Sequence, residues 1–143
     1  IFWAETGRGA WLDQRKLRVA ARRHLNEAVI ATGTPWHGIP GETHANFARE
    51  IAAMTPATAG IRRYGSAALD LAWVAAGRFD GFWERGLKPW DIAAGIVLVR
   101  EAGGMATEMN DGNLLETGDI LAGNPDLHPL LLRQIRMANG AKA

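Results

Sequence analysis

The chain has 143 residues, and its 48% hydrophobic and 22% charged content is that of a globular protein with one ordinary core, not of a disordered chain. Sixteen Lys and Arg against fifteen Asp and Glu leave a net charge of +1, which gives no composition-based reason to expect binding to nucleic acid or to an anionic membrane. The absence of cysteine excludes disulfides, thiolate metal ligands and a cysteine nucleophile, and it suits a reducing cytosol.

The first 26 residues have the pattern of short strands without a helix. Residues 2–12 predict two strands around the turn Thr6-Gly7-Arg8-Gly9, and residues 17–19 predict a third strand after a turn at 13–16. We interpret residues 1–26 as the trailing antiparallel strands of a preceding domain. Because the sequence opens on strand-like residues without an initiator Met, we expect that an N-terminal half is missing.

From Glu27 onward, predicted strands alternate with predicted helices, which is typical of a layered α/β domain. The strands are expected at residues 27–32, 61–64, 79–84, 105–109 and 120–123. The helices are expected after the caps Thr43 and Ser66, at residues 90–102, and after the cap Asn124. Their apolar faces are expected to contain Phe47, Ile51 and Met54 in the first helix, Leu69, Trp73 and Ala76 in the second, and Leu127, Leu130, Leu131 and Ile135 in the last. We therefore predict an α/β domain over residues 27–143.

The segment Trp90-Asp91-Ile92-Ala93-Ala94-Gly95, followed by Arg100-Glu101-Ala102-Gly103-Gly104, is the most informative part of the sequence. Asp91 lies at or next to a helix N-terminus, where backbone N–H groups and the helix dipole favour an ionised carboxylate. A carboxylate oxygen is a ligand that Mg²⁺ prefers. The small residues after Asp91 let another element pack close to the first turn. Asp is also a leading N-cap residue, so the pattern by itself fits a purely structural cap.

This block resembles the C-terminal signature of the inositol monophosphatase family, in which Trp-Asp and Gly-Gly flank the same helix. The segments at residues 6–12, 17–19 and 28–33 are also similar to segments of the family, so the resemblance extends over essentially the whole chain. It implies the C-terminal part of the αβαβα layered fold of inositol monophosphatases and sugar phosphatases, with a mixed sheet and helices on both faces.

The resemblance also implies functional residues. Asp91 would bind a catalytic Mg²⁺ and touch the substrate, and Gly65, Ser66 and Ala67 would line the substrate pocket. Glu84 would accept hydrogen bonds from polyol hydroxyls, since a carboxylate repels phosphate. Considered without the family, residues 65–67 are an ordinary helix start and Glu84 is a solvated strand end. The upstream glutamate and the Asp-Pro-Ile/Leu-Asp-Gly-Thr segment that complete the family's metal site do not occur in this sequence.

The activity implied for the full-length protein is Mg²⁺-dependent hydrolysis of myo-inositol monophosphate or of a similar small polyol phosphate, and the chain alone is expected to be inactive. Two alternatives stay open: a nucleotide or sugar bisphosphate phosphatase of the same superfamily, and a regulatory protein that uses the fold as a binding module. The resemblance further implies a lithium-sensitive, cytoplasmic homodimer that acts on a small phosphomonoester. No apolar run approaches the roughly 20 residues of a membrane span, and no nucleic-acid-binding patch is evident.

Overall fold

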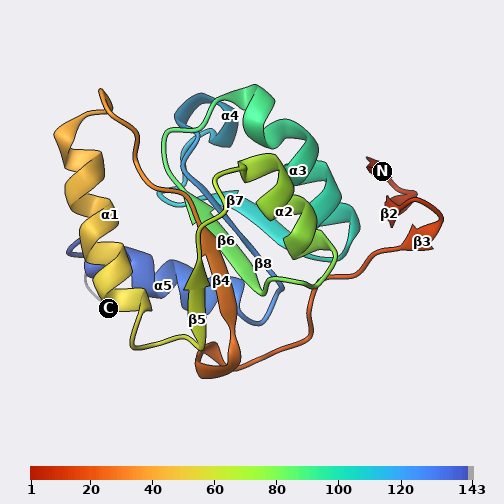
Figure 1. Ribbon diagram of the computed structural model, residues 1–143, viewed down its shortest axis with the longest axis horizontal. Coiled ribbons are helices and arrows are strands. Elements are labelled where there is room, and N and C mark those ends of the chain that lie inside the picture. Colours follow the sequence, from red (N-terminus) through yellow and green to blue (C-terminus); the bar gives the residue numbers. More distant parts are fainter. Residues whose placement is uncertain (142–143) are drawn as a thin grey trace.

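The computed structural model describes residues 1–141 and contains two β-sheets (Figure 1). A small antiparallel sheet has the order β1-β2-β3, and its strands are Phe2–Glu5, Gly9–Leu12 and Arg15–Lys16. A larger sheet has the order β5-β4-β6-β8-β7, and its strands β4 to β8 are Val29–Thr32, Gly60–Arg62, Gly81–Glu84, Met105–Glu108 and Ile120–Gly123. Strands β5, β4 and β6 are parallel, whereas β8 runs antiparallel to both of its neighbours, so this sheet is mixed.

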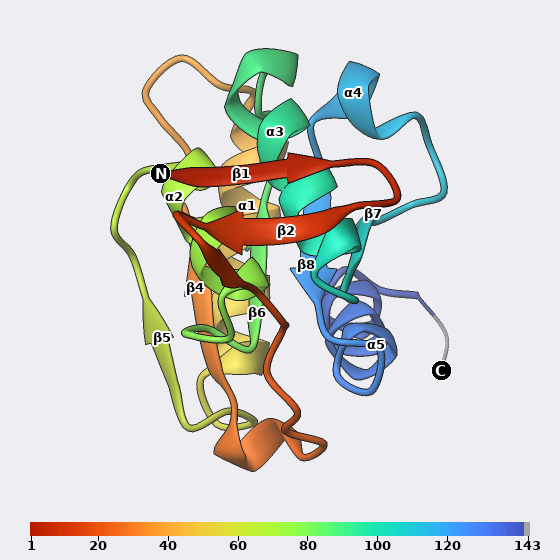
Figure 2. The same ribbon diagram turned by 90° about the vertical axis from the view of Figure 1, so that its right-hand side faces the viewer.

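Helices cover both faces of the larger sheet (Figure 1). On one face lie α1 (Gly41–Met54) and α5 (His128–Ala138), and on the other lie α2 (Ala67–Ala75) and α3 (Pro89–Glu101). The hairpin of β1 and β2 packs on α3 from outside (Figure 2). The mixed α/β fold with helices on both faces is therefore confirmed. Among residues 1–141, none of the helices combines the length and the apolar composition of a membrane span.

Two short helices were not anticipated from the sequence. They are η1 (Leu25–Glu27) and α4 (Leu114–Thr117). The expected cap Asn124 does serve the last turn before α5, because its side chain accepts hydrogen bonds from the backbone N–H groups of Asp126 and Leu127 at 3.0 and 2.8 Å. Its amide also donates to the carbonyls of Ala20 and Arg22, at 2.9 Å each, which ties the segment after β3 to the start of α5.

Side chains alternate along the strands and divide the core into two clusters, one on each face of the larger sheet. Ala31 and Phe82 point toward α2 and α3. Ile30 and Trp83 point toward α1 and α5 on the opposite face. Because successive side chains of a strand point to opposite faces, Glu84, two residues after Phe82, lies on the α2 side of the sheet.

The helices α2 and α3 pack closely because Gly95 has no side chain. A Cβ atom at Gly95 would lie 2.4 Å from Cδ1 and 2.6 Å from Cβ of Leu71. This contact confirms the expectation that a small residue after Asp91 lets another element approach. The alanines Ala93 and Ala94, which share the same turn, are exposed and do not take part in this contact.

The buried face of α2 differs from the expected one. Its buried residues are Ala67, Asp70, Leu71, Ala72, Val74 and Ala75. Leu69, expected in the core, is 37% exposed, whereas Trp73 and Ala76 are partly buried and pack against the core. The prediction is wrong for Leu69 because Asp70 is the only polar residue in this nine-residue helix, so the apolar pattern does not select a face.

Two other local predictions are wrong. Residues 17–19 form no strand, and β3 occupies part of the expected turn, because the chain leaves the small sheet after Lys16 and the Val19 N–H donates to Ala102 O at 3.1 Å. Thr43 does not cap α1. The helix begins at Gly41 with Pro40 as its N-cap, so Thr43 already lies in the first turn and its N–H donates to Pro40 O at 2.9 Å.

Candidate functional site

A pocket of about 370 Å³ opens at the edge of the larger sheet where β4, β5 and β6 end. From β4 the chain passes to α1 on one face, whereas from β5 it passes to α2 on the other (Figure 1). Such a change of side leaves a crevice at the carboxyl ends of the strands, which is the usual binding position in open α/β sheets. Its lining includes all five predicted site residues, namely Gly65, Ser66, Ala67, Glu84 and Asp91, together with Gly33 and Arg63. The structure thus brings the five into one pocket, while their roles stay predictions.

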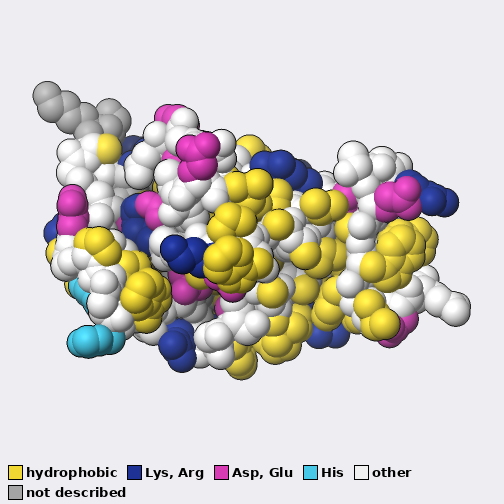
Figure 3. All heavy atoms as spheres, turned by 90° about the horizontal axis from the view of Figure 1, so that it is seen from above, with side chains coloured by type: hydrophobic (Ala, Val, Ile, Leu, Met, Phe, Trp, Pro, Cys, Tyr) yellow, Lys and Arg dark blue, Asp and Glu magenta, His cyan; other side chains and the backbone are white. Residues whose placement is uncertain are grey.

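Exposed aromatic side chains lie beside this pocket. Trp36, Tyr64 and Trp90 are 56%, 55% and 79% exposed, and each lines the pocket or adjoins a residue that does. Figure 3 views the molecule from above and shows hydrophobic side chains gathered on this upper side of the molecule, with acidic and basic side chains between them. Two larger hollows, of about 520 and 570 Å³, lie along residues 16–27 and contain none of the five predicted residues.

Residues 65–67 connect β5 to α2. Gly65 has φ of +82°, a left-handed conformation that a side chain would strain. Ser66 is the N-cap of α2, as predicted, yet its side chain makes no capping hydrogen bond. Its hydroxyl is therefore not used by the helix, and the free N–H groups of the first turn of α2 favour a negatively charged ligand.

Asp91 lies in the first turn of α3, where its Oδ2 accepts a hydrogen bond from the Lys88 N–H at 3.1 Å. The carboxylate therefore acts as a cap, and within residues 1–141 its other oxygen has no hydrogen-bond partner. No group of three or more His, Cys, Asp or Glu in the described part of the chain could hold a metal ion. An ionised carboxylate oxygen in an open pocket has the chemistry that Mg²⁺ prefers. Asp91 fits the ion as one ligand of a larger set.

Glu84 ends β6 and lies over Gly33. The pairing of Thr32 with Trp83 makes Gly33 and Glu84 the next neighbours along β4 and β6. A Cβ atom at Gly33 would lie 2.0 Å from Oε1 and 2.2 Å from Oε2 of Glu84, so a side chain at position 33 would force the carboxyl group of Glu84 out of this position. Gly33 is therefore a pocket residue that was not among the predicted site residues, although it directly follows the strand expected at residues 27–32.

The carboxyl group of Glu84 is half-buried beside a second acid, Asp70 of α2. The pKa of Glu84 is raised from 4.5 to about 7. Burial is the largest cause, and the negative charge of Asp70 is the next largest. Asp91 raises this pKa further, whereas Arg63 lowers it. Burial also raises the pKa of Asp70 from 3.8 to about 6, against the opposing charge of Arg63. Two neighbouring acids with raised pKa values are a feature of functional sites.

Sequence reasoning missed Asp70 and Arg63. The predicted apolar face of α2 left Asp70 on the outside, whereas it is 0% exposed. Arg63 was not among the predicted site residues. The sequence signal that could have identified Asp70 is that it is the lone acid in an otherwise apolar helix. The signal for Arg63 is its position two residues before Gly65.

A buried network of hydrogen bonds and ion pairs holds the side chains on both sides of Glu84. Glu50 is 0% exposed and accepts hydrogen bonds from Trp83 Nε1 at 3.1 Å, Arg85 Nε at 2.9 Å and Asn139 Nδ2 at 2.7 Å. Arg85 Nη1 also donates to Asp119 at 2.9 Å. The residues immediately before and after Glu84 are thereby tied to α1, α5 and the segment that precedes β8.

Residues 1–139 match the Inositol monophosphatase family. The inositol-1-monophosphatase of Caulobacter vibrioides is 51% identical over 141 residues, which cover 96% of this chain and 54% of the relative. The Nus factor SuhB of Pseudomonas aeruginosa is 46% identical over 136 residues, which cover 94% of this chain and 50% of the relative. The crystal structure of the extragenic suppressor protein suhB from Bartonella henselae aligns with a TM-score of 0.88 at 48% identity, covering 94% of this chain and 51% of that chain.

The chain spans about half the length of the curated relatives that it matches. The match nevertheless extends over nearly all of the chain, and it includes β4 to β6, α2 and α3, the elements that form the pocket. The resemblance inferred from the Trp90-Asp91 block is therefore confirmed by sequence and by structure. The chain belongs to the inositol monophosphatase family.

Proposed function

We propose that the protein to which this chain belongs hydrolyses the phosphate monoester of inositol, or of a similar small polyol, with the help of Mg²⁺. The observation that supports this function best is that Gly65, Ser66, Ala67, Glu84 and Asp91 all line one pocket at the ends of the parallel strands. Membership of the family supports the phosphatase class. The names of the curated relatives differ, so the substrate itself is part of the proposal.

The charges of the pocket favour one orientation of a phosphorylated polyol. The first turn of α2 offers free N–H groups and Arg63 a positive charge, which attract the anionic end of the substrate. Glu84 repels phosphate, and its oxygens can accept hydrogen bonds from hydroxyls. We therefore assign Glu84 to the polyol end, and Gly65, Ser66 and Ala67 to binding along the wall formed by the start of α2.

Asp91 is the residue of this chain that would hold Mg²⁺. Such an ion, when bound, offsets the negative charge of the phosphate and lowers the pKa of an attacking water. Asp91 supplies one carboxylate, whereas Mg²⁺ takes about six oxygen ligands. We assign the other ligands to the part of the whole protein that this chain does not include. The position of Asp91 in the first turn of α3 orients its free oxygen, because the Lys88 N–H holds the other one.

Phosphate release tests this proposal. The whole protein should release phosphate from inositol 1-phosphate in millimolar Mg²⁺, and it should prefer this substrate to a 3′-phosphorylated nucleotide or a sugar bisphosphate. The 143-residue chain, purified free of longer protein, should release none, because it holds a single carboxylate for the metal. Turnover by this chain alone, or a preference of the whole protein for a nucleotide, would contradict the proposal.

The remaining properties implied by the family are also proposals. We propose that residues 1–26 are the trailing strands of a first domain and residues 27–143 a second domain, of which 142 and 143 lie outside the described residues. The separation of the strands into two sheets supports this division. We further propose a cytoplasmic, lithium-sensitive homodimer. Sedimentation and phosphate release with added lithium are the corresponding measurements.

A binding role is a second candidate, and it rests on the name Nus factor SuhB carried by a relative at 46% identity. Such a role does not need the metal ligand. Asp91→Asn should therefore lower any turnover strongly without affecting binding to a partner. If the unchanged protein shows no phosphatase activity toward any of the substrates above, while the pocket residues can be replaced without loss of cellular function, the binding role is the correct one.

A further inference from the structure

Trp36 lines the pocket, and none of the roles proposed above uses it. It is 56% exposed, and among residues 1–141 it is the only aromatic residue in the lining of this pocket. Single exposed apolar residues are common on protein surfaces. An indole in the wall of a concave pocket is different, because it contacts whatever binds there.

A tight turn presents this indole. Residues 36–39 form a β-turn, in which the Ile39 N–H donates to Trp36 O at 3.3 Å. Gly38, at the third position of the turn, has φ of +93°, a left-handed conformation that glycine adopts without strain. A Cβ atom at Gly38 would lie 3.4 Å from Cζ3 of Trp36, so the indole packs over this glycine. The turn therefore restricts the orientation of the indole.

The connection that carries Trp36 is held against the end of β6 on both sides of the turn. Before the turn, the carboxyl group of Glu84 occupies the place of a side chain at Gly33. After the turn, Ile39 lies against Gly86, where a Cβ atom would be 3.0 Å from Ile39 Cδ1. Trp36 lies midway between these contacts in the sequence, and three residues of extended chain span at most about 11 Å. The indole therefore belongs to the same end of the pocket as Glu84.

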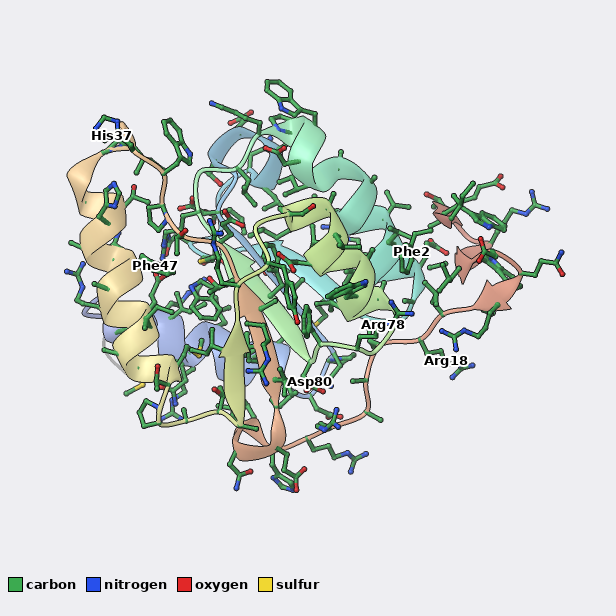
Figure 4. The ribbon with its side chains drawn as sticks, in the orientation of Figure 1. Phe2, Arg18, His37, Phe47, Arg78 and Asp80 are labelled. Carbon is green, nitrogen blue, oxygen red and sulfur yellow. The ribbon has the colours of Figure 1, made fainter. Side chains whose placement is uncertain are left out.

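The two residues that flank Trp36 lie on different sides of the connection. Pro35 and Phe47 line a small hollow together with Glu84, and Phe47 lies on the side of α1 that faces the sheet (Figure 4). The proline ring restricts the backbone directly before Trp36. His37 lies at the outer end of the connection (Figure 4), is exposed and does not line the pocket. Of the neighbours Trp36 and His37, only Trp36 can touch a ligand in the pocket.

The face of an indole is suited to C–H groups that carry a partial positive charge. The π-system of an aromatic ring is negative on its face, and C–H groups next to oxygen atoms are polarised enough to make weak hydrogen bonds. In a cyclic polyol, hydroxyl groups that project from the rim leave C–H groups on the two faces of the ring. The hydroxyls of the rim can bond to the Glu84 carboxylate while one face packs on Trp36. A linear polyol has no such face.

We propose that Trp36 is a specificity-determining residue, whose indole packs on the C–H face of a cyclic polyol in this pocket. The inference rests on the function proposed above, and it narrows the substrate from small polyol phosphates to those that contain a ring. The size of the pocket supports a single small ring, since about 370 Å³ is near the lower limit of the roughly 300–1,000 Å³ typical of ligand pockets. A nucleotide carries a base as well as a sugar and would need more room.

The kinetic test compares a cyclic with a linear substrate in the whole protein. Trp36→Ala should raise KM for inositol 1-phosphate roughly tenfold, the lower end of what the loss of an apolar contact costs in a pocket, with KM for glycerol 1-phosphate nearly unchanged. Trp36→Phe keeps an aromatic face and should recover most of the affinity. His37→Ala is the matched control, because it alters the same turn without removing a wall of the pocket, and it should leave both KM values unchanged. An equal rise of KM for both substrates in Trp36→Ala, or the same rise in His37→Ala, would overturn the inference.

A ¹⁹F NMR titration separates this inference from the proposed function, because it needs no turnover. In whole protein labelled with 5-fluorotryptophan, the Trp36 signal, assigned by its loss in Trp36→Phe, should shift when myo-inositol is added and stay in place when glycerol is added. Absence of a shift with myo-inositol, or a shift with a 3′-phosphorylated nucleotide alone, would overturn the inference, whether or not the protein is a phosphatase. A shift with myo-inositol in a protein that releases no phosphate would overturn the proposed function and leave the contact of Trp36 with a cyclic polyol intact.

Discussion

Gly33 directly follows β4 and Glu84 ends the paired parallel strand β6, and the carboxyl group of Glu84 fills the space that a side chain at position 33 would need. The orientation of Glu84 therefore depends on a residue that has no functional group of its own. This dependence can be tested without touching the carboxylate.

Gly33→Ala should displace Glu84 from its position over β4. We expect KM for inositol 1-phosphate to rise roughly tenfold, the equivalent of losing about one hydrogen bond to a charged group, with little change for an aryl phosphate. The matched control is Gly41→Ala at the start of α1, where a Cβ atom would meet nothing within 4 Å. Equal kinetic constants for the two alanine variants would show that Glu84 tolerates the crowding.

Asp91→Asn should separate the capping role from the metal role. Asparagine is also a good residue at a helix start, so the melting temperature should stay near that of the unchanged protein. If Asp91 holds Mg²⁺, loss of its charge should lower kcat on the order of 100-fold or more and raise the Mg²⁺ concentration needed for activity. Thermal melting and a Mg²⁺ titration of kcat distinguish the two roles. Normal melting with normal activity would leave Asp91 as a cap only.

The stability of the protein should depend on pH through Asp70. The pKa of Asp70 is about 6 in the folded state and near 3.8 in the unfolded state. Between these two pH values Asp70 is therefore protonated when the protein is folded and ionised when it is unfolded. The stabilising contribution of Asp70 is thus fully present below pH 4 and is lost as pH rises through 6. Relative to the unchanged protein, Asp70→Asn should gain on the order of 1–3 kcal/mol between pH 4 and pH 7. Urea unfolding at both pH values measures this change, and a gain that does not vary with pH would contradict it.

Gly95→Ala should push α2 and α3 apart. The added methyl group would lie 2.6 Å from Leu71 Cβ. This clash cannot be relieved by rotating the Leu71 side chain, because the Cβ atom does not move in such a rotation. We expect a loss of about 1–3 kcal/mol in the free energy of unfolding, typical of overpacking. In a Leu71→Ala background, the same substitution should cost less, since the opposing side chain is then smaller. Purely additive losses in the double variant would show that the two residues do not compete for space.

Much of the fold could be predicted from the sequence because its elements are short and strongly marked. The alternation of strands and helices after Glu27 and the α3 helix, expected at residues 90–102 and found at Pro89–Glu101, follow from apolar periodicity and from Pro and Gly at the boundaries. The site was predicted through the family resemblance, and the structure places its five residues in one pocket.

What could not be predicted depends on contacts between distant segments. The burial of Asp70 is set by which side of a nearly all-apolar helix meets the sheet, and periodicity does not decide this when eight of its nine residues are apolar. The role of Gly33 depends on the register of β4 with β6, and no local pattern specifies the register of parallel strands joined by crossovers. The third strand was misplaced for a local reason, since the chain turns over only two residues and Arg15 and Lys16 pair with Leu12 and Trp11 in a short hairpin.

The hydrogen bonds and ion pairs made by the side chains of Trp83 and Arg85 have a consequence for how selectivity can change in this protein. They join the residues on either side of position 84 to α1, α5 and the segment before β8, and none of these bonds involves the side chain of residue 84. A different side chain at this position is therefore presented on the same backbone and toward the same pocket. If Glu84 selects the alcohol as we propose, one codon change at position 84 can alter which alcohol is accepted while the fold stays the same. Position 84 is then the first position to change in order to direct the protein toward other phosphate esters.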